Sequence, residues 1–359
     1  MHIGIITATF SEVIVKVGEG MKEVRIQDAV GSVLVHDLTQ IIPGGFKGVK
    51  FKKGHVVQEN DVETLLNMGK KTLYVLEKSD SDVHEDDAAM RIARAATGDG
   101  VTFSDPKEGK VEFFAGHGGL LKINTNMLTN LIDRDEIMFA SIHENRLVEK
   151  GDKLAGTRVI PLFVSEEVVG CAEKTLAGGP LIEVKKLRNL KVGLVTTGSE
   201  VYSGRIEDGF GPILKEKFRQ LGSNVFEQLF SDDDEEMIAD RIKRLLDMGA
   251  EMIGVTGGMS VDPDDRTPAG IKKAGGHIVI YGAPALPGAM FLLAYIGKIP
   301  VVGLPGCVMY HNISIFDLIV PRILAGETLL RGDIKKLAHG GLCLNCTPCA
   351  FPNCGFGKA

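Results

Sequence analysis

The sequence lacks an excess of basic residues. It holds 41 Lys and Arg against 47 Asp and Glu in 359 residues, for a formal net charge of −6. Proteins that bind DNA or RNA usually present a basic surface to the phosphate backbone. We therefore expect no nucleic-acid partner.

The sequence also lacks a recognisable segment for export or membrane insertion. Residues 1–7 hold no basic stretch followed by a long apolar one, which is the pattern of a signal peptide. The stretch 278–297 runs for 20 residues without a charge, near the length that spans a bilayer, but Pro284 and Pro287 would break a spanning helix. We interpret it as a buried strand, a loop and a buried helix, and we expect a cytoplasmic protein without membrane contact.

Cysteine is scarce except near the end of the chain, where four of the six cysteines fall within the last 17 residues. This distribution does not fit the disulfide framework of a small secreted domain. The four are spaced C-x2-C-x2-C-x4-C, at Cys343, Cys346, Cys349 and Cys354. Thiols this close can converge on one metal, and the spacing allows an iron–sulfur cluster or a zinc site. The alternative is a tail of reduced or redox-sensitive thiols that binds no metal.

A chain of this length has room for two or three domains. The pattern of apolar and polar residues changes three times along the chain, and a polar linker at 78–82 marks the first change. We predict four regions: a mixed α+β region at 1–80, a β-rich region at 81–185 that opens with a helix at 85–96, an α/β domain at 186–328, and a Cys-rich tail at 329–359.

The region 186–328 alternates apolar strands with amphipathic helices. This alternation predicts an α/β fold, a doubly wound and mostly parallel sheet with helices on both faces. The expected strands lie at 191–195, 225–230, 251–255, 277–280 and 299–302, and the expected helices at 211–221, 234–248, 267–274 and 312–324.

Small and hydroxyl-bearing residues follow the strands of this domain. In open parallel sheets these loops meet at the carboxyl edge, where ligands bind. Backbone N–H groups and hydroxyls there can bind an anion, so we predict a phosphate-bearing ligand. The alternative is that Gly and Pro only mark turns. The candidate binding residues are Thr197, Gly198, Ser199, Gly257, Gly258, Ser260, Pro287, Gly288 and Gly306.

Carboxylates lie beside these loops. Asp232 and Asp233 follow one expected strand, and Asp262, Asp264 and Asp265 follow another. Acidic groups would repel a phosphate unless a cation lay between them, and Mg²⁺ is usually held by one or two carboxylates plus substrate phosphates. The alternatives are structural, namely an acidic helix cap at 231–236 and a turn before the helix at 267.

The order of these motifs resembles a known family. The segment from about 190 to 325 is similar to the molybdopterin-binding domain shared by molybdopterin adenylyltransferase and molybdopterin molybdenumtransferase. The matching motifs are Gly204 with Asp208-Gly-Phe-Gly-Pro212, Asp232 after the next strand, Thr256-Gly-Gly-Met259 with Asp265-Arg-Thr-Pro268, Pro287-Gly288, and Leu304-Pro-Gly306.

The resemblance implies a ligand and two chemistries. The ligand would be molybdopterin or its adenylated form, with Mg²⁺. One family enzyme joins the pterin phosphate to AMP, and the other cleaves that adenylate while molybdate is inserted. By match, Asp232 and Asp265 would be catalytic, and Asp208 would join the binding loops. The family also suggests a homodimer.

The sequence departs from the family at two points. The Leu-Pro-Gly loop continues with Cys307 instead of Asn-Pro or Ser-Pro, and the Ser-Ala-Met-Asp-Gly-Tyr-Ala segment of the molybdenumtransferases is not found. Residues 20–80 nevertheless resemble the start of that enzyme, so a multi-domain layout favours the insertion reaction. Two alternatives stay open. One is a non-catalytic protein that binds or senses molybdopterin or molybdate, with a metal or redox tail. The other is a pyrophosphatase acting on another nucleotide.

Overall fold

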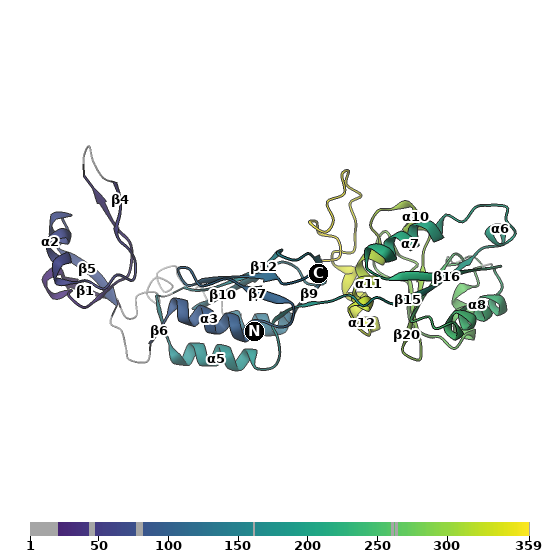
Figure 1. Ribbon diagram of the computed structural model, residues 1–359, viewed down its shortest axis with the longest axis horizontal. Helices are drawn as coiled ribbons and strands as arrows, with labels where there is room; N and C mark the ends of the chain where they lie inside the picture. Colours follow the sequence, from purple (N-terminus) through teal and green to yellow (C-terminus); the bar gives the residue numbers. More distant parts are fainter. Residues whose placement is uncertain are drawn as a thin grey trace, which may run out of the picture.

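The structure is a computed structural model that describes residues 21–42, 47–76, 82–160, 162–259, 262 and 265–358. Figure 1 shows an elongated chain in which the N-terminal elements, a middle region and the C-terminal α/β region follow one another along the long axis. No helix within the described ranges is both long and apolar enough to cross a bilayer.

The N-terminal elements form a small α+β unit. The three-stranded antiparallel sheet has the order β1-β5-β2, with β1 at Met21–Arg25, β5 at Thr72–Leu76 and β2 at Val33–Leu34. Helix α2 (Glu59–Asn67) packs on it through Leu65, and a hairpin of β3 (Leu38–Ile41) and β4 (Lys47–Phe51) extends from it. The buried residues of this unit form a core of their own.

The middle region combines sheets with helices. Its strands are β6 (Asp82–His84), β7 (Val101–Phe103), β8 (Lys110–Ala115), β9 (Gly119–Ile123), β10 (Ile137–Ser141), β11 (Leu147–Val148), β12 (Lys153–Val159), β13 (Phe163–Ser165) and β14 (Ile182–Lys185). They form the sheets β10-β12-β8-β7, β11-β9-β14 and β13-β6. Helix α3 occupies Glu85–Ala96, as the sequence predicts.

Two helices of the middle region were not predicted from the sequence. These are α4 (Thr125–Ile132) and α5 (Glu166–Leu176). The start of α5 does carry a helix signal, because the Ser165 side chain accepts a hydrogen bond from the Val168 N–H and two glutamates fill the first turn. Arg91 of α3 forms ion pairs with Glu166 and Glu173 of α5, at 2.7 Å each, and these pairs link the two helices.

The C-terminal region is an α/β domain around one six-stranded sheet. The order is β16-β15-β17-β20-β19-β18, and the pairs β15–β16, β15–β17 and β17–β20 are parallel. The strands are β15 (Lys191–Thr197), β16 (Asn224–Ser231), β17 (Met252–Thr256), β18 (His277–Tyr281), β19 (Leu292–Ile296) and β20 (Ile299–Leu304). The predicted α/β content and the expected strands are therefore present, and four strands form a parallel block.

Helices cover both faces of this sheet. Helices α7 (Phe210–Gln220) and α11 (Ile315–Leu324) pack on one face through residues such as Phe218 and Ile319. Helices α8 (Glu235–Asp247) and α9 (Thr267–Lys273) pack on the other through Ile242 and Ile271. Figure 1 shows the sheet between α7 and α8. Residues of the central strands β15, β17 and β20 enter both cores, as expected of a sheet buried on both faces.

The prediction of a buried helix after the loop at 282–288 is wrong. Residues Leu292–Ile296 form β19, which pairs antiparallel with both β18 and β20. A short apolar run fits a buried helix and a buried strand equally well by periodicity. Its length of five residues, ended by Gly297, suits the strand.

The Cys-rich tail folds against the α/β domain. After α12 (Arg331–Lys335), residues 339–358 form turns without a long helix or strand. The Gly357 N–H donates to the Gly340 carbonyl at 2.9 Å and closes the segment into a loop. Phe356, with 3% of its surface exposed, belongs to the same core as α7 and α11.

Candidate functional site

The candidate site lies where the parallel strands end. β15 ends at Thr197, β16 at Ser231, β17 at Thr256 and β20 at Leu304. Because these strands run in the same direction, their final residues share one edge of the sheet. We refer to this line of strand ends and the loops that follow them as the carboxyl edge.

Ser199 joins the loops of β15 and β16. Its hydroxyl donates to Asp232 Oδ1 at 2.5 Å, and its N–H donates to Asp233 Oδ2 at 2.9 Å. The Asp233 N–H also donates to Asp232 Oδ1, at 2.8 Å. The bond from the Ser199 hydroxyl, followed by that from the Asp233 N–H, lowers the pKa of Asp232 below its ordinary value, so this carboxylate is ionised at neutral pH.

Thr267 joins the loops of β15 and β17. Its hydroxyl donates to the Gly257 carbonyl at 2.9 Å and lies 3.2 Å from the hydroxyl of Thr197. Gly257 has φ +82°, and a Cβ there would collide with the Thr197 carbonyl oxygen. Only glycine therefore fits where the two loops cross.

Asp232 and Asp265 lie on the same part of the carboxyl edge. Asp232 is bonded to Ser199, two residues beyond Thr197, and Asp265 lies two residues before Thr267, which contacts Thr197. The Asp265 N–H donates to the Asp262 carbonyl at 3.0 Å, in a turn that leads into α9. Ser260 and Asp264 lie outside the described residues.

Asp208 lies on the α7 face of the sheet, beside the end of β15. Its carboxylate accepts bonds from the N–H groups of Phe210 and Gly211 at the start of α7. Gln228 Nε2 donates to Asp208 Oδ2 at 2.6 Å and to Thr196 Oγ1 at 2.9 Å. Asp208 thus caps α7 and is linked to the strand that carries Thr197 and Ser199.

The predicted residues Pro287 and Gly288 contact α11. The Ile315 N–H donates to the Pro287 carbonyl at 3.1 Å, and a Cβ on Gly288 would collide with the Ile315 side chain. Strand β18 runs in the same direction as β20, since both are antiparallel to β19, so this loop also starts at the carboxyl edge.

Gly306 and Cys307 follow β20. Gly306 is the N-cap of the short helix α10 (Cys307–Tyr310), and a Cβ on it would meet no atom within 4 Å. Burial raises the pKa of the Cys307 thiol, so it stays protonated at neutral pH. A neutral thiol is a poor nucleophile and a poor metal ligand.

Sequence reasoning missed Gln228 and Thr196 as members of the site. A signal was present, because Gln228 interrupts an otherwise apolar stretch at 225–230 together with Glu227. A polar residue within a buried strand usually has a hydrogen-bond partner. The buried hydroxyl of Thr256, at the end of β17, has no such partner among the described residues.

The four tail cysteines are not gathered into a metal centre. Within the described ranges, no three His, Cys, Asp or Glu side chains are grouped so that they could hold a metal ion. All four thiols are free; Cys346 and Cys349 are exposed, whereas Cys343 and Cys354 pack partly buried against the core of α7 and α11. The predicted iron–sulfur or zinc site therefore has no preformed geometry.

Comparison with known families identifies two segments. Residues 193–325 match the family described as "Probable molybdopterin binding domain", which confirms the resemblance seen in the motifs for this part of the chain. Residues 23–77 match a family described only as a domain of unknown function. The tail lies outside both matches.

Curated relatives are similar over short segments. A CinA-like protein of Mycobacterium avium is 28% identical over 93 residues, which cover 26% of this chain and 21% of that protein. A molybdopterin molybdenumtransferase of Synechococcus elongatus is 28% identical over 113 residues, covering 29% of this chain and 28% of that enzyme. The chain thus matches less than a third of either relative's length. Among solved structures, the molybdopterin biosynthesis enzyme MoaB of Thermus thermophilus aligns over 38% of this chain and 98% of that chain, with 17% identity and a TM-score of 0.32.

Proposed function

We propose that the protein binds molybdopterin or its adenylate at the carboxyl edge and acts in Mg²⁺-dependent adenylate cleavage with molybdate insertion. The family match over 193–325 supports the ligand class. One structural observation supports the proposal further: Asp232 is bonded to Ser199, and Asp265 lies two residues before Thr267, which contacts Thr197, so both carboxylates lie beside the loop that follows β15.

The carboxylates of the carboxyl edge could hold a magnesium ion whose remaining coordination positions are filled by the ligand. Carboxylate oxygens are the hard donors that Mg²⁺ prefers, and the lowered pKa of Asp232 keeps it charged. No described group of three acidic or imidazole side chains closes around an ion. Asp232 and Asp265 would therefore hold Mg²⁺ only together with a phosphate, and the bound ion would supply charge neutralisation at the phosphoryl oxygens.

The remaining residues of the edge would position the ligand. Ser199 orients Asp232 through its hydroxyl and the neighbouring Asp233 through its N–H, so the Asp232 carboxylate does not have to be ordered when substrate arrives. Gly257 and Gly258 are partly exposed and carry no side chain, so a phosphate could approach the backbone of this loop closely. Phosphoryl transfer depends mainly on such positioning and on charge stabilisation.

The test is turnover of molybdopterin adenylate by anaerobically purified protein with Mg²⁺ and molybdate, followed as AMP release. Asp232→Asn and Asp265→Asn should each lower the rate by about 100-fold or more, because each removes a charge used in the transition state. Asp240→Asn is the matched control, since Asp240 is an exposed aspartate of α8 that, among the described residues, pairs with its neighbour Arg241. It should leave the rate unchanged.

Three other outcomes would overturn the assignment in different ways. Normal turnover in Asp265→Asn would remove this residue from catalysis. Tight binding of the adenylate by wild-type protein without AMP release would favour a non-catalytic binding or sensing role. Hydrolysis of common dinucleotides, with molybdopterin adenylate left intact, would favour a pyrophosphatase.

A further inference from the structure

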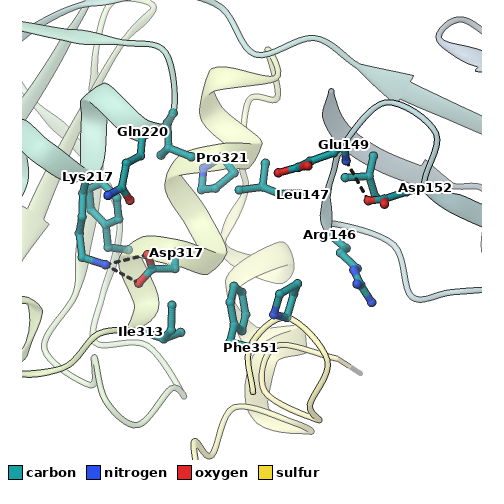
Figure 2. A pocket seen from close by; sticks show the side chains of 14 residues that line it. Arg146, Leu147, Glu149, Asp152, Lys217, Gln220, Ile313, Asp317, Pro321 and Phe351 are labelled. Carbon is teal, nitrogen blue, oxygen red and sulfur yellow. Dashed lines mark hydrogen bonds and ion pairs between the residues drawn. The ribbon is translucent and has the colours of Figure 1, made fainter. Parts of the chain in front are cut away.

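A cavity of about 440 Å³ lies between the middle region, the α/β domain and the tail. Figure 2 shows Arg146 and Glu149 of the middle region on one side and Lys217 and Asp317 of the α/β domain on the other, with Phe351 of the tail at the base. Small-molecule sites have volumes of roughly 300–1,000 Å³ and often lie where domains meet.

The walls of this cavity are fixed relative to one another. Lys122 of β9 pairs with Glu327 at 2.9 Å, and Glu327 also pairs with Arg322 of α11 at 2.8 Å. Arg188, on the connection into β15, donates from its N–H and its guanidinium to the carbonyls that end α11. The Lys122–Glu327 pair therefore joins the middle region to the α/β domain, and the Arg188 bonds hold the connection between them against α11.

Arg146 lacks a partner among the described residues. Its Nε is buried and makes no hydrogen bond, and no ion pair of its guanidinium is found in the described part of the chain. Lys217 of the cavity pairs with Asp317 at 2.8 Å, and Asp152 accepts from the Glu149 N–H at 2.9 Å, whereas the Glu149 carboxylate forms no ion pair within the described part of the chain. A buried donor of a cation without an acceptor is costly, and an anion would satisfy it.

A second cation lies near Arg146. Lys358 donates to the Pro352 carbonyl at 2.6 Å, and its pKa is lowered by burial and by the positive charge of Arg146. Lys358 therefore adds positive charge beside Pro352, a residue that lines the cavity. The Glu149 carboxylate lines the same cavity, but its side chain is exposed to solvent, where its field is screened.

The rest of the lining is apolar. Ile313, Phe316 and Pro321 of the α/β domain and Phe351 of the tail face the cavity. From this charge and shape, we infer that the cavity is a second ligand site, which takes a small molecule with one phosphate or carboxylate group and an aromatic or aliphatic body, anchored by Arg146.

This site is separate from the part of the carboxyl edge that holds Asp208, although Ile315, which neighbours the lining residue Phe316, contacts Pro287. Asp208 caps the start of α7, whereas Lys217 and Gln220, which line the cavity, lie in its last turn. A helix of this length separates its ends by about 15 Å. The ligand would be held by three segments at once, so its binding would stabilise the junction of the two regions and the tail.

The test uses the full chain and three matched probes: phenyl phosphate, phenylacetate and neutral 2-phenylethanol. Titration calorimetry should show binding of at least one of the two anions, and which one binds identifies the acidic group. The neutral probe should bind about tenfold or more weakly, because it lacks the charged acceptor. Arg146→Met should cause a loss of similar size, and Arg331→Met, at an exposed arginine of α12, should cause none.

Failure of both anions to bind would overturn the inference, as would equal binding by Arg146→Met and wild type. Should Arg146→Met unfold, Phe351→Ala provides the second variant, since it removes part of the apolar wall and should weaken either anion. Asp265→Asn should bind the probes as wild type does. Failure of the probes to bind therefore leaves the proposal for the carboxyl edge untouched. Failure of the turnover test likewise leaves the inference about the cavity untouched.

Discussion

The backbone N–H of Cys343 donates a hydrogen bond of 2.8 Å to the carbonyl of Leu286, the residue before Pro287. The Leu286 N–H in turn donates to the Gly341 carbonyl at 2.7 Å, so the tail and the loop after β18 form a short parallel bridge. The first cysteine of the tail is therefore attached to a loop of the carboxyl edge. Any change in the tail can reach that loop through two backbone bonds.

Phe356→Ala should release the tail from the domain. Phe356 is 3% exposed and packs in the core of α7 and α11, so its truncation should cost about 3–5 kcal/mol of local or global stability. Hydrogen exchange of the Cys343 and Leu286 amides should accelerate if the tail opens.

Leu344→Ala is the control for this change. Leu344 is 83% exposed, so its truncation should leave both exchange rates as they are in wild type. Faster exchange in Leu344→Ala, or unchanged exchange in Phe356→Ala, would show that the bridge does not depend on the buried aromatic.

The metal content of the purified protein tests whether the tail cysteines bind a metal. Anaerobically purified protein should contain zinc or iron, and the Cys346→Ser and Cys349→Ser double variant should lose it, because the exposed thiols would have to close on the ion. Cys171→Ser, at a cysteine outside the tail, should retain the metal. Wild-type protein without metal, measured by mass spectrometry, would leave the tail as a cluster of thiols.

Gly257→Ala and Gly306→Ala should have different effects, because we expect Gly257 to be needed for the fold and Gly306 to face the ligand. At Gly257, φ is +82° and a Cβ would strike the Thr197 carbonyl, so alanine should lower stability by about 1–3 kcal/mol. At Gly306, φ is −52° and the space is open, so alanine should leave the unfolding midpoint unchanged. If a phosphate approaches this backbone, Gly306→Ala should still weaken binding of the pterin ligand. Unchanged affinity would remove Gly306 from the site.

The strands and helices of the α/β domain could be predicted because their signals are local. Apolar strands alternate with amphipathic helices there, and Asp234 at the N-cap of α8 marks a boundary that the structure retains. The strand at Leu292–Ile296 could not be distinguished from a helix, because its pairing with β18 and β20 depends on contacts far along the chain.

The grouping of the site residues was only partly predictable. The rule that parallel strands end at one edge places Asp232 and Asp265 together, and this agrees with the bond of Asp232 to Ser199 and with the contact of Thr197 with Thr267, two residues after Asp265. The docking of the tail on Leu286 left no local signal, because it uses backbone bonds that any residue can make. The same holds for the cavity at Arg146, which is formed by three segments distant in sequence.

Acid should weaken the junction between the middle region and the α/β domain at Glu327. Burial raises the pKa of Glu327, but hydrogen bonds from Arg322 and Lys122 outweigh this effect, so its pKa lies below the ordinary value. A carboxyl group whose pKa is lower in the folded state stabilises the fold above its unfolded pKa, near 4.3, and loses that contribution as pH falls through the folded pKa.

Glu327→Gln should therefore be less stable than wild type by about 1–3 kcal/mol at pH 7 in urea unfolding, because charged hydrogen bonds are lost. The difference should shrink as pH falls below about 4.3, where the unfolded chain begins to take up a proton at Glu327, and vanish once the folded protein is protonated there as well. Glu216→Gln, which removes an exposed pair with Arg219, should differ little from wild type at any pH, since solvent screens that pair. A Glu327→Gln difference that stays constant down to pH 3 would mean that the side chain stabilises the junction by packing, with its charge making no contribution.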